Sequence, residues 1–320
     1  SRHHSDKASL LAGFDAIRKS ERQEPVSALD AAGTFRAALH TRSDVASPLI
    51  YASSLADARS LAGDIDIVAV TGNSMGWYTA LAAGGALTED DGFRVVNTMG
   101  RLMHKRGACG QLVYPPVGPD WRPDPVRKAE LLDLVAELGA RDGQKLDLSI
   151  DLGGLLVVAG DEAGLAAFEA ALPRLDDRFP MRLANHAAFH TALVQRVSEA
   201  GRAALSPSMF GQPRLPLVDG RGHVWWPGAC DPWAIWDYTL GAQVLTAYDF
   251  TGAIRTAACE FAPDLFIIAG PGTTMGGAVA QSLIQCAWRD MDDKAAFEAL
   301  QQKSGLLAAM GRNDQRAWVT

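Results

Sequence analysis

The stretch DIDIVAVTGNSMGWYTALAAGG, residues 64–85, decides the fold of this chain. It opens with Ile65–Val70, an apolar run rich in β-branched residues, which predicts a buried strand. The turn GNSMG (residues 72–76) comes next, and the apolar, proline-free segment Trp77–Ala83 predicts a helix. A strand, a G-x-S-x-G turn and a helix in this order form the pattern of a nucleophile elbow.

Ser74 stands at the apex of this turn, where its hydroxyl is exposed to a substrate. Gly72 and Gly76 lack a Cβ, so we expect both to permit a sharp turn and close packing of strand against helix. Free N–H groups at the start of a helix favour developing negative charge, and the Met75 amide is the predicted oxyanion donor. The motif alone is weak in a chain with 31 glycines, because an ordinary turn with Ser74 as helix N-cap contains the same residues. The flanking strand and helix favour catalysis.

The 320-residue chain has a net charge of −7, with 48% hydrophobic and 21% charged residues. This balance is typical of a globular protein with one large domain or two smaller ones, and the negative charge argues against a general nucleic-acid surface. The four cysteines are widely spaced and form no C-x-x-C pair, which predicts reduced thiols in a cytoplasmic protein. No apolar run reaches about 18 residues and no signal peptide is visible, so we expect no membrane span.

The organisation of the chain changes at residue 110. Residues 110–183 read as strand, helix, strand, strand, helix and strand, an order that predicts a ferredoxin-like module. The segments on both sides alternate helices with short apolar strands, which is typical of an α/β protein. We therefore expect a hydrolase-like parallel-sheet core formed by residues 1–109 and 184–320, with an inserted ferredoxin-like α+β subdomain at 110–183.

A serine hydroxyl needs a base to act as a nucleophile. His186 and His190 lie where the predicted subdomain rejoins the core, and a cleft between domains is expected there. His190 is the better candidate, because it immediately precedes a helix and Phe189 shields it. Asp151 is the acidic residue beside glycines between the serine and the histidine, but it lies inside the subdomain. The sequence therefore favours a dyad of Ser74 and His190, with a backbone carbonyl orienting the imidazole.

Taken together, these motifs resemble the malonyl-CoA:acyl-carrier-protein transacylase family, which includes the acyltransferase domains of fatty-acid and polyketide synthases. Residues 72–76 look like the family's GHSxG, and Ala188-Phe189-His190 is similar to the x-F-H that carries its catalytic histidine. The further similar segments are GGALTEDDGFRVVNTMGRLM (84–103), SIDLGGLLVVAG (149–160) and GPG (270–272). The likeness runs in the family's order from about residue 30 to residue 300.

The resemblance implies a ping-pong acyl transfer. Ser74 attacks an acyl-CoA thioester with His190 as general base, and an acyl-serine forms. The phosphopantetheine thiol of an acyl carrier protein then takes the acyl group. Acyl-CoA and this thiol are substrates, and the family chemistry requires neither a metal nor a redox cofactor. The implied partner is therefore the acyl carrier protein, with no nucleic acid and no membrane.

The sequence departs from the family's pattern at several positions. The G-Q-G-x-Q turn that supplies a second oxyanion donor in the family has no match before residue 64. Met99 stands where the family has its carboxylate-binding arginine, and without that residue a bidentate contact is lost. Asn73 and Trp77 replace the family's usual histidine and glutamate. The residues predicted to bind substrate are Met99, Trp77, Asn73 and Phe189, although core packing is the favoured explanation for Trp77. We expect an uncharged acyl group rather than malonyl.

Other functions stay open at this point. A serine thioesterase or hydrolase would form the same acyl-serine and pass it to water. A patatin-like Ser–Asp dyad would use Asp219, although Asp219-Gly220 is also a common turn. A non-catalytic acyltransferase-like scaffold would bind a carrier protein or a synthase partner without chemistry, which the missing turn and Met99 both favour.

Overall fold

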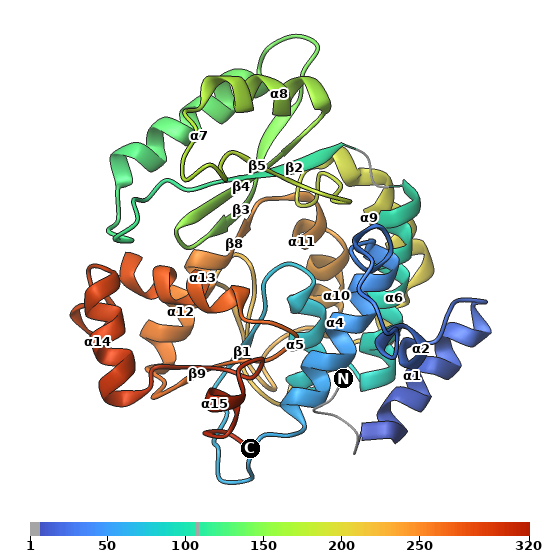
Figure 1. The fold of residues 1–320 in the computed structure, drawn as a ribbon. Helices are drawn as coiled ribbons and strands as arrows, with labels where there is room; N and C mark the ends of the chain where they lie inside the picture. The colour runs from blue at the N-terminus through green and yellow to red at the C-terminus, as the bar shows by residue number, and fades with distance from the viewer. Residues whose placement is uncertain (1–6, 107–108) are drawn as a thin grey trace.

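The computed structural model describes residues 7–106 and 109–320, and the remaining positions of the predicted core range 1–109 lie outside this description. The protein has a mixed α/β fold in which the C-terminal end lies on the side away from the sheet formed mainly by residues 110–183 (Figure 1). The helices that precede this sheet are α1 (Ala8–Ser20), α2 (Val26–Asp30), α3 (Ala37–His40), α4 (Ser43–Ala58), α5 (Gly76–Ala83) and α6 (Glu89–Arg106).

Helix α5 is the most enclosed of the helices near the motif. Its residues Trp77–Ala82 are buried, and α4 and α6 pack against it. Helix α6 begins where Thr88 Oγ1 accepts a hydrogen bond from the Asp91 amide (3.1 Å), with acidic residues in its first turn as the helix dipole favours. Its apolar face buries Phe93, which stacks on Phe14 at a ring distance of 4.3 Å. The elbow therefore rests on a rigid helical base.

The strands beside the elbow are short. Strand β1 (Val70–Thr71) pairs in parallel with β6 (Leu217–Val218), which pairs antiparallel with β7 (Val224–Trp225). The expectation of a strand over residues 65–70 is wrong for residues 65–69. Pro216 precedes β6 and has no N–H to donate, so only its carbonyl bonds the Val70 amide (2.9 Å) and the ladder stops there.

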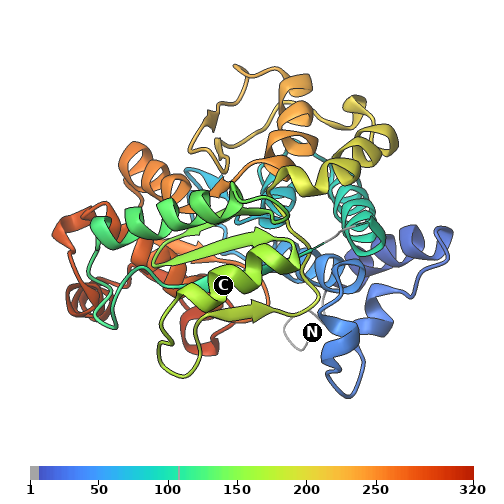
Figure 2. The same ribbon diagram turned by 90° about the horizontal axis from the view of Figure 1, so that it is seen from above.

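The small sheet has the strand order β5-β2-β4-β3-β8. Strands β2, β4, β3 and β5 pair antiparallel, whereas β8 joins β3 in parallel. Helices α7 and α8 lie side by side on one face of the sheet, as both views show (Figures 1 and 2). The elements are β2 (Gly110–Tyr114), α7 (Pro125–Gly139), β3 (Leu146–Leu152), β4 (Leu155–Gly160), α8 (Glu162–Ala171), β5 (Met181–Leu183) and β8 (Tyr248–Asp249).

The rest of the chain is mainly helical and closes the fold around the elbow. A parallel pair, β9 (Phe266–Ile268) and β10 (Leu307–Ala309), forms a separate two-stranded sheet. The helices are α9 (Gln195–Ala204), α10 (Pro232–Leu240), α11 (Ala242–Leu245), α12 (Phe250–Phe261), α13 (Thr274–Gln285), α14 (Lys294–Ser304) and α15 (Asn313–Arg316), with 3-10 turns at Ala192–Val194, Pro207–Met209 and Trp288–Asp290. Within the described residues, the structure contains no helix that combines the length and the apolar character needed to span a bilayer.

Two buried clusters make up most of the interior. The first joins α1, α4, α5, α6, α9 and α10 and includes Trp77 and Met99. The second joins the small sheet and its helices to α12, α13 and α14, with Ile254 packed among the residues of the sheet. The small sheet therefore does not enclose a core of its own.

Candidate active site

Ser74 lies in the sharp turn between β1 and α5 with a backbone φ of +54°, in the left-handed region that is unusual for a non-glycine residue. The turn depends on Gly72, because a Cβ there would lie 2.2 Å from the Gly76 carbonyl oxygen. A Cβ on Gly76 would meet nothing within 4 Å. The expectation that both glycines are sterically required is therefore wrong for Gly76 and holds for Gly72.

The hydroxyl of Ser74 and the imidazole of His190 lie in direct contact, with Oγ 2.7 Å from Nε2. The second ring nitrogen of His190, Nδ1, is 2.6 Å from the backbone carbonyl oxygen of Gln243. A carbonyl oxygen only accepts hydrogen bonds, so Nδ1 must carry the proton. The neutral ring then presents the Nε2 lone pair to the Ser74 hydroxyl, which is the orientation that a general base requires.

Burial keeps this imidazole neutral. His190 is 4% exposed, and the loss of solvation lowers its pKa from 6.5 to about 4, although the hydrogen bond to the Gln243 carbonyl opposes the shift. At neutral pH the ring is therefore unprotonated and ready to accept the serine proton. Tyr248 covers one side of it, with a ring distance of 5.4 Å, and its hydroxyl donates to the Gly72 carbonyl.

Gln243 holds both members of the pair. Its backbone carbonyl accepts from His190, and its side-chain Nε2 donates to the Ser74 carbonyl oxygen at 3.0 Å. Its Oε1 accepts from the Tyr78 hydroxyl at 3.2 Å, so both polar atoms of the buried amide make a hydrogen bond. The sequence analysis missed Gln243 and Tyr248. A contact through a backbone carbonyl has no residue signature, and neither residue belongs to a motif.

His190 has a strained backbone. Its φ is +59°, again in the left-handed region. Such a conformation costs about 1–3 kcal/mol for a residue with a side chain and persists only where the surroundings impose it. The adjoining turn is fixed by hydrogen bonds from the Thr191 hydroxyl to the Ala188 carbonyl and from the Phe189 amide to the Ala187 carbonyl, both 2.8 Å. The imidazole thus reaches Ser74 from a backbone that its surroundings hold in place.

Two polar groups beside Ser74 are unengaged in the part of the chain that the structure describes. The Met75 amide has no acceptor there, although the next amide, of Gly76, bonds the Asn73 carbonyl at 2.7 Å. The Asn73 side-chain oxygen is buried without a donor. A free N–H next to the serine can meet an oxyanion.

The other residues predicted to bind substrate lie at different depths. Trp77 is fully enclosed, and its indole N–H donates to Thr239 Oγ1 at 2.9 Å. Met99 is 2% exposed, and its sulfur lies against the backbone of Gly201 in α9. Phe189 is half-buried.

Two acidic residues that the sequence offered as acid partners form hydrogen bonds and ion pairs with other residues and not with Ser74 or His190. The Asp219 carboxylate accepts hydrogen bonds from the Arg221 side chain and from the Trp225 indole N–H. The Asp151 carboxylate pairs with Lys128 and accepts from the Thr251 hydroxyl. A backbone carbonyl stands where a triad would place an acid. Among residues 7–106 and 109–320, histidine, cysteine and acidic side chains form no group of three that could hold a metal ion.

The fold and the serine–histidine pair define a class, that of α/β proteins with a nucleophile elbow. Solved structures narrow the class, although no protein-family model and no curated protein matches the chain. The malonyl-CoA:acyl carrier protein transacylase (FabD) of Xanthomonas oryzae pv. oryzae matches with a TM-score of 0.75 and 20% identity, over 99% of this chain and 90% of that one.

Two further solved structures of malonyl transferases have the same fold. The acyl carrier protein S-malonyltransferase of Vibrio cholerae O1 biovar eltor has a TM-score of 0.74 and 17% identity, over 98% of this chain and 92% of that one. A malonyl-transacylase solved in complex with a type II PKS acyl-carrier protein has a TM-score of 0.70 and 18% identity, over 93% of each chain. The chain therefore has the fold of the malonyl-CoA:acyl carrier protein transacylases, and the resemblance predicted from the motifs is confirmed at the level of the fold.

Proposed function

We propose that this protein is an acyltransferase that carries an acyl group from acyl-CoA to the phosphopantetheine thiol of an acyl carrier protein. The observation that carries the proposal is the contact of 2.7 Å between Ser74 Oγ and the neutral, oriented His190, on an elbow in this fold. Similarity to structures whose titles name malonyl-CoA and the acyl carrier protein supports the choice of substrates.

The proposed reaction has two half-reactions. In the first, the Ser74 hydroxyl proton passes to His190 Nε2 while Oγ attacks the thioester carbonyl. The carbon–sulfur bond breaks, and the CoA sulfur takes the proton from His190, which leaves acyl-Ser74. In the second, His190 takes the proton of the pantetheine thiol, the sulfur attacks the ester, and Ser74 recovers the proton. The Met75 amide donates to the oxyanion in both halves.

We propose that the acyl group is uncharged. Met99 occupies the position of the family's carboxylate-binding arginine, and a buried thioether offers a carboxylate no donor. Arg101 does not substitute for that arginine, because its guanidinium pairs with Glu21 at 3.3 Å on the other side of α6 from the buried Met99. A free carboxylate placed beside Met99 would lose its hydration without gaining a partner.

The other predicted contacts are assigned as follows. Asn73 is proposed to accept a hydrogen bond from an N–H of the substrate, because its buried oxygen has no donor in the described part of the chain. Phe189 is proposed to line the acyl site beside His190. We assign Trp77 to packing, since its ring is enclosed and its N–H is bonded.

We also propose a division of labour within the fold. Residues 1–109 and 184–320 would form the hydrolase-like catalytic core, and residues 110–183 a ferredoxin-like subdomain. The order β5-β2-β4-β3 with antiparallel neighbours and two helices on one face is the arrangement expected of such a subdomain.

The test is to trap the acyl-enzyme. Incubation with acetyl-CoA and, separately, with malonyl-CoA should leave an acyl group on Ser74, detected by mass spectrometry of the peptide. Acetyl-CoA should react faster, and a carrier protein bearing phosphopantetheine should discharge the enzyme faster than water does. Ser74→Ala should abolish labelling, whereas Ser304→Ala, at the exposed end of α14, should not change it.

Each outcome is decisive. A strong preference for malonyl-CoA would refute the uncharged acyl group. Discharge by water at the rate seen with carrier protein would point to a thioesterase instead. Failure of Ser74 to react with either thioester, and with a fluorophosphonate, would leave the non-catalytic scaffold as the better interpretation.

A further inference from the structure

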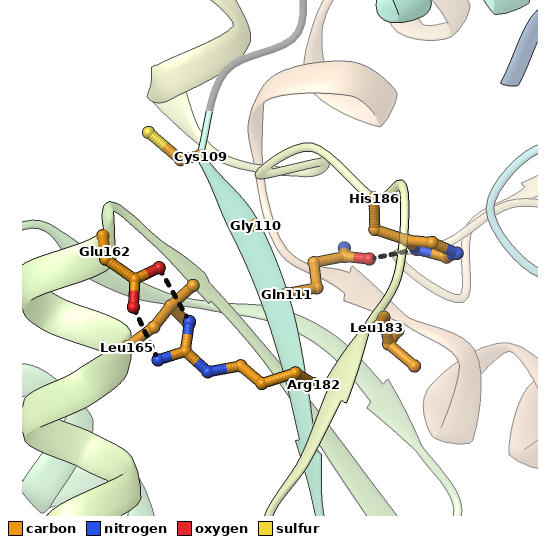
Figure 3. A pocket seen from close by; sticks show the side chains of 8 residues that line it. All are labelled: Cys109, Gly110, Gln111, Glu162, Leu165, Arg182, Leu183 and His186. Atoms are coloured by element: carbon orange, nitrogen blue, oxygen red, sulfur yellow. Dashed lines mark hydrogen bonds and ion pairs between the residues drawn. The ribbon is translucent and has the colours of Figure 1, made fainter. Parts of the chain in front are cut away.

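A series of hydrogen bonds, buried at its centre, runs from the small sheet to the residue that precedes the proposed base. His186 Nδ1 lies 2.8 Å from Gln111 Oε1, Gln111 Nε2 lies 2.7 Å from Ser149 Oγ, and Ser149 Oγ lies 2.8 Å from the Phe189 carbonyl oxygen. Gln111 belongs to β2 and Ser149 to β3, whereas His186 and Phe189 belong to the segment that leaves the sheet. Figure 3 shows the first link, from His186 on this segment to Gln111 on the neighbouring strand.

The donor and the acceptor in each of these three hydrogen bonds can be assigned. The Phe189 carbonyl only accepts, so Ser149 donates its proton to it and accepts from the Gln111 amide nitrogen. The Gln111 oxygen then faces His186, which must carry a proton on Nδ1. Partial desolvation lowers the pKa of His186, although the residue is exposed on one side. Gln111 is 2% and Ser149 0% exposed, so water does not compete for the bond between them, whereas His186 is exposed at the outer end of the series.

The last hydrogen bond of the series, from the Ser149 hydroxyl to the Phe189 carbonyl, lies next to the strained backbone of His190. The peptide that joins Phe189 to His190 fixes the φ of His190, which is +59°. Ser149 holds the carbonyl of that peptide, and its own hydroxyl is held by Gln111. If the carbonyl turned, His190 would relax toward an ordinary φ and Nε2 would move away from Ser74 Oγ.

We propose that Ser149 and Gln111 are positioning residues for His190: the small sheet holds the Phe189 carbonyl so that the histidine keeps the backbone conformation that brings its ring to Ser74. This inference rests on the proposed function, because it assigns the sheet a part in the same serine–histidine chemistry. It gives the sheet a role in setting the geometry of the base in addition to any role in binding substrate.

A cavity of about 570 Å³ lies on the outer side of this series, and Gln111 and His186 form part of its wall together with Arg182 and Glu162 (Figure 3). Arg182 is already paired with Glu162 at 3.1 Å and with Glu169 at 3.0 Å. The arginine in the wall is therefore already neutralised by ion pairs, and the Gln111 amide and His186 Nδ1 are engaged in the hydrogen-bond series.

The test compares Ser149→Ala with Ser282→Ala. Both serines are fully buried and donate to a backbone carbonyl at 2.8 Å, but Ser282 does so to Ala278 within α13. The readouts are the rate at which a fluorophosphonate labels Ser74, and kcat and KM for acyl-CoA. Ser149→Ala should slow labelling and lower kcat by roughly 10- to 100-fold with KM little changed, because a small displacement of the base has that effect. Ser282→Ala should label at the wild-type rate, and Ser149→Thr, which keeps a hydroxyl, should recover part of the loss.

A second variant covers the case in which Ser149→Ala does not fold. Gln111→Glu keeps the size of the side chain, but a carboxylate only accepts, so the Ser149 hydroxyl turns toward it and leaves the Phe189 carbonyl without a donor. Its labelling rate should fall in the same way while circular dichroism shows a folded protein. Wild-type labelling rates in both folded variants would overturn the positioning role. An unlabelled wild-type protein would instead refute the proposed nucleophile, so the two failures are distinguishable.

Discussion

His190, the proposed base, is oriented by a backbone carbonyl and not by a carboxylate. A carboxylate would raise the pKa of the ring strongly, whereas the neutral carbonyl of Gln243 selects the tautomer and opposes the effect of burial only in part. Burial then decides the protonation state and lowers the pKa to about 4. The ring is a weak base that is always available at neutral pH, and its contact with Ser74 compensates for its low proton affinity.

The reaction of Ser74 should therefore persist to unusually low pH. Labelling by a fluorophosphonate should stay level from pH 8 to about pH 5.5 and then fall with an apparent pKa near 4, the value at which His190 gains its proton. His190→Ala should lower the plateau by at least about 100-fold, the usual contribution of a general base. Circular dichroism at each pH separates loss of reaction from unfolding. A midpoint near 6.5, the value of an ordinary histidine, would show that the ring is solvated and not buried as described.

The same shift makes stability depend on pH. The unfolded chain binds a proton at this histidine below pH 6.5, whereas the folded protein does so only near pH 4. Because the folded pKa is the lower one, the contribution of His190 to stability is complete above pH 6.5 and is lost as the pH falls from 6.5 toward 4. His190→Ala should therefore flatten the acid side of the curve of melting temperature against pH.

At the scale of the elements, the strand–turn–helix unit sets the position of Ser74, the proposed nucleophile. Only one of the two motif glycines is sterically required, because a Cβ at position 72 would overlap the Gly76 carbonyl while position 76 is open. Tyr248 also holds the Gly72 carbonyl from the far side of the turn. Strand β1 contributes two residues to the ladder, so the turn depends on these contacts more than on a long strand.

Gly72→Ala and Gly76→Ala form a matched pair that tests this view. Gly72→Ala should destabilise the protein by about 1–3 kcal/mol, as overpacking does, and should slow labelling of Ser74 because the turn must open. Gly76→Ala should be neutral or stabilise by up to about 1 kcal/mol, because alanine favours the helix and the added methyl group meets no neighbour. Urea unfolding and fluorophosphonate labelling measure both effects. Equal losses in the two variants would contradict the geometry of the turn.

The sequence could predict the parts of the site that lie in local patterns. The elbow, its helix and the histidine before α9 all follow from glycine spacing and apolar periodicity within short windows. The length of the elbow strand could not be predicted, because Pro216, about 150 residues away in the chain, ends the ladder. Gln243 could not be found either, since it acts on His190 through a backbone carbonyl and the fold alone brings it there.

At the scale of the whole molecule, the small sheet and the helices α12 to α14 share one buried cluster. Strand β8 extends the sheet in parallel to β3, and Thr251 at the start of α12 bonds both Asp151 and the Gly153 amide. The sheet would expose a large apolar surface without these helices. Because Ser149 of the sheet also bonds the carbonyl of the peptide before His190, we expect the stability of the sheet and the geometry of the proposed base to be linked.

The small sheet should therefore unfold together with the rest of the protein. Ile254 in α12 is 2% exposed and packs in the shared cluster, so Ile254→Ala should cost about 2–5 kcal/mol, as other large-to-small core substitutions do. Val126→Ala, at a position on α7 that is 68% exposed, should change stability by less than about 0.5 kcal/mol. Urea unfolding followed by far-ultraviolet circular dichroism and by tryptophan fluorescence should give coincident single transitions for all three proteins, with the midpoint of Ile254→Ala lowered in both signals. Two separate transitions, of which Ile254→Ala moves only one, would show that the sheet unfolds independently. The hydrogen bond from Ser149 to the Phe189 carbonyl could then break while the rest of the protein stays folded.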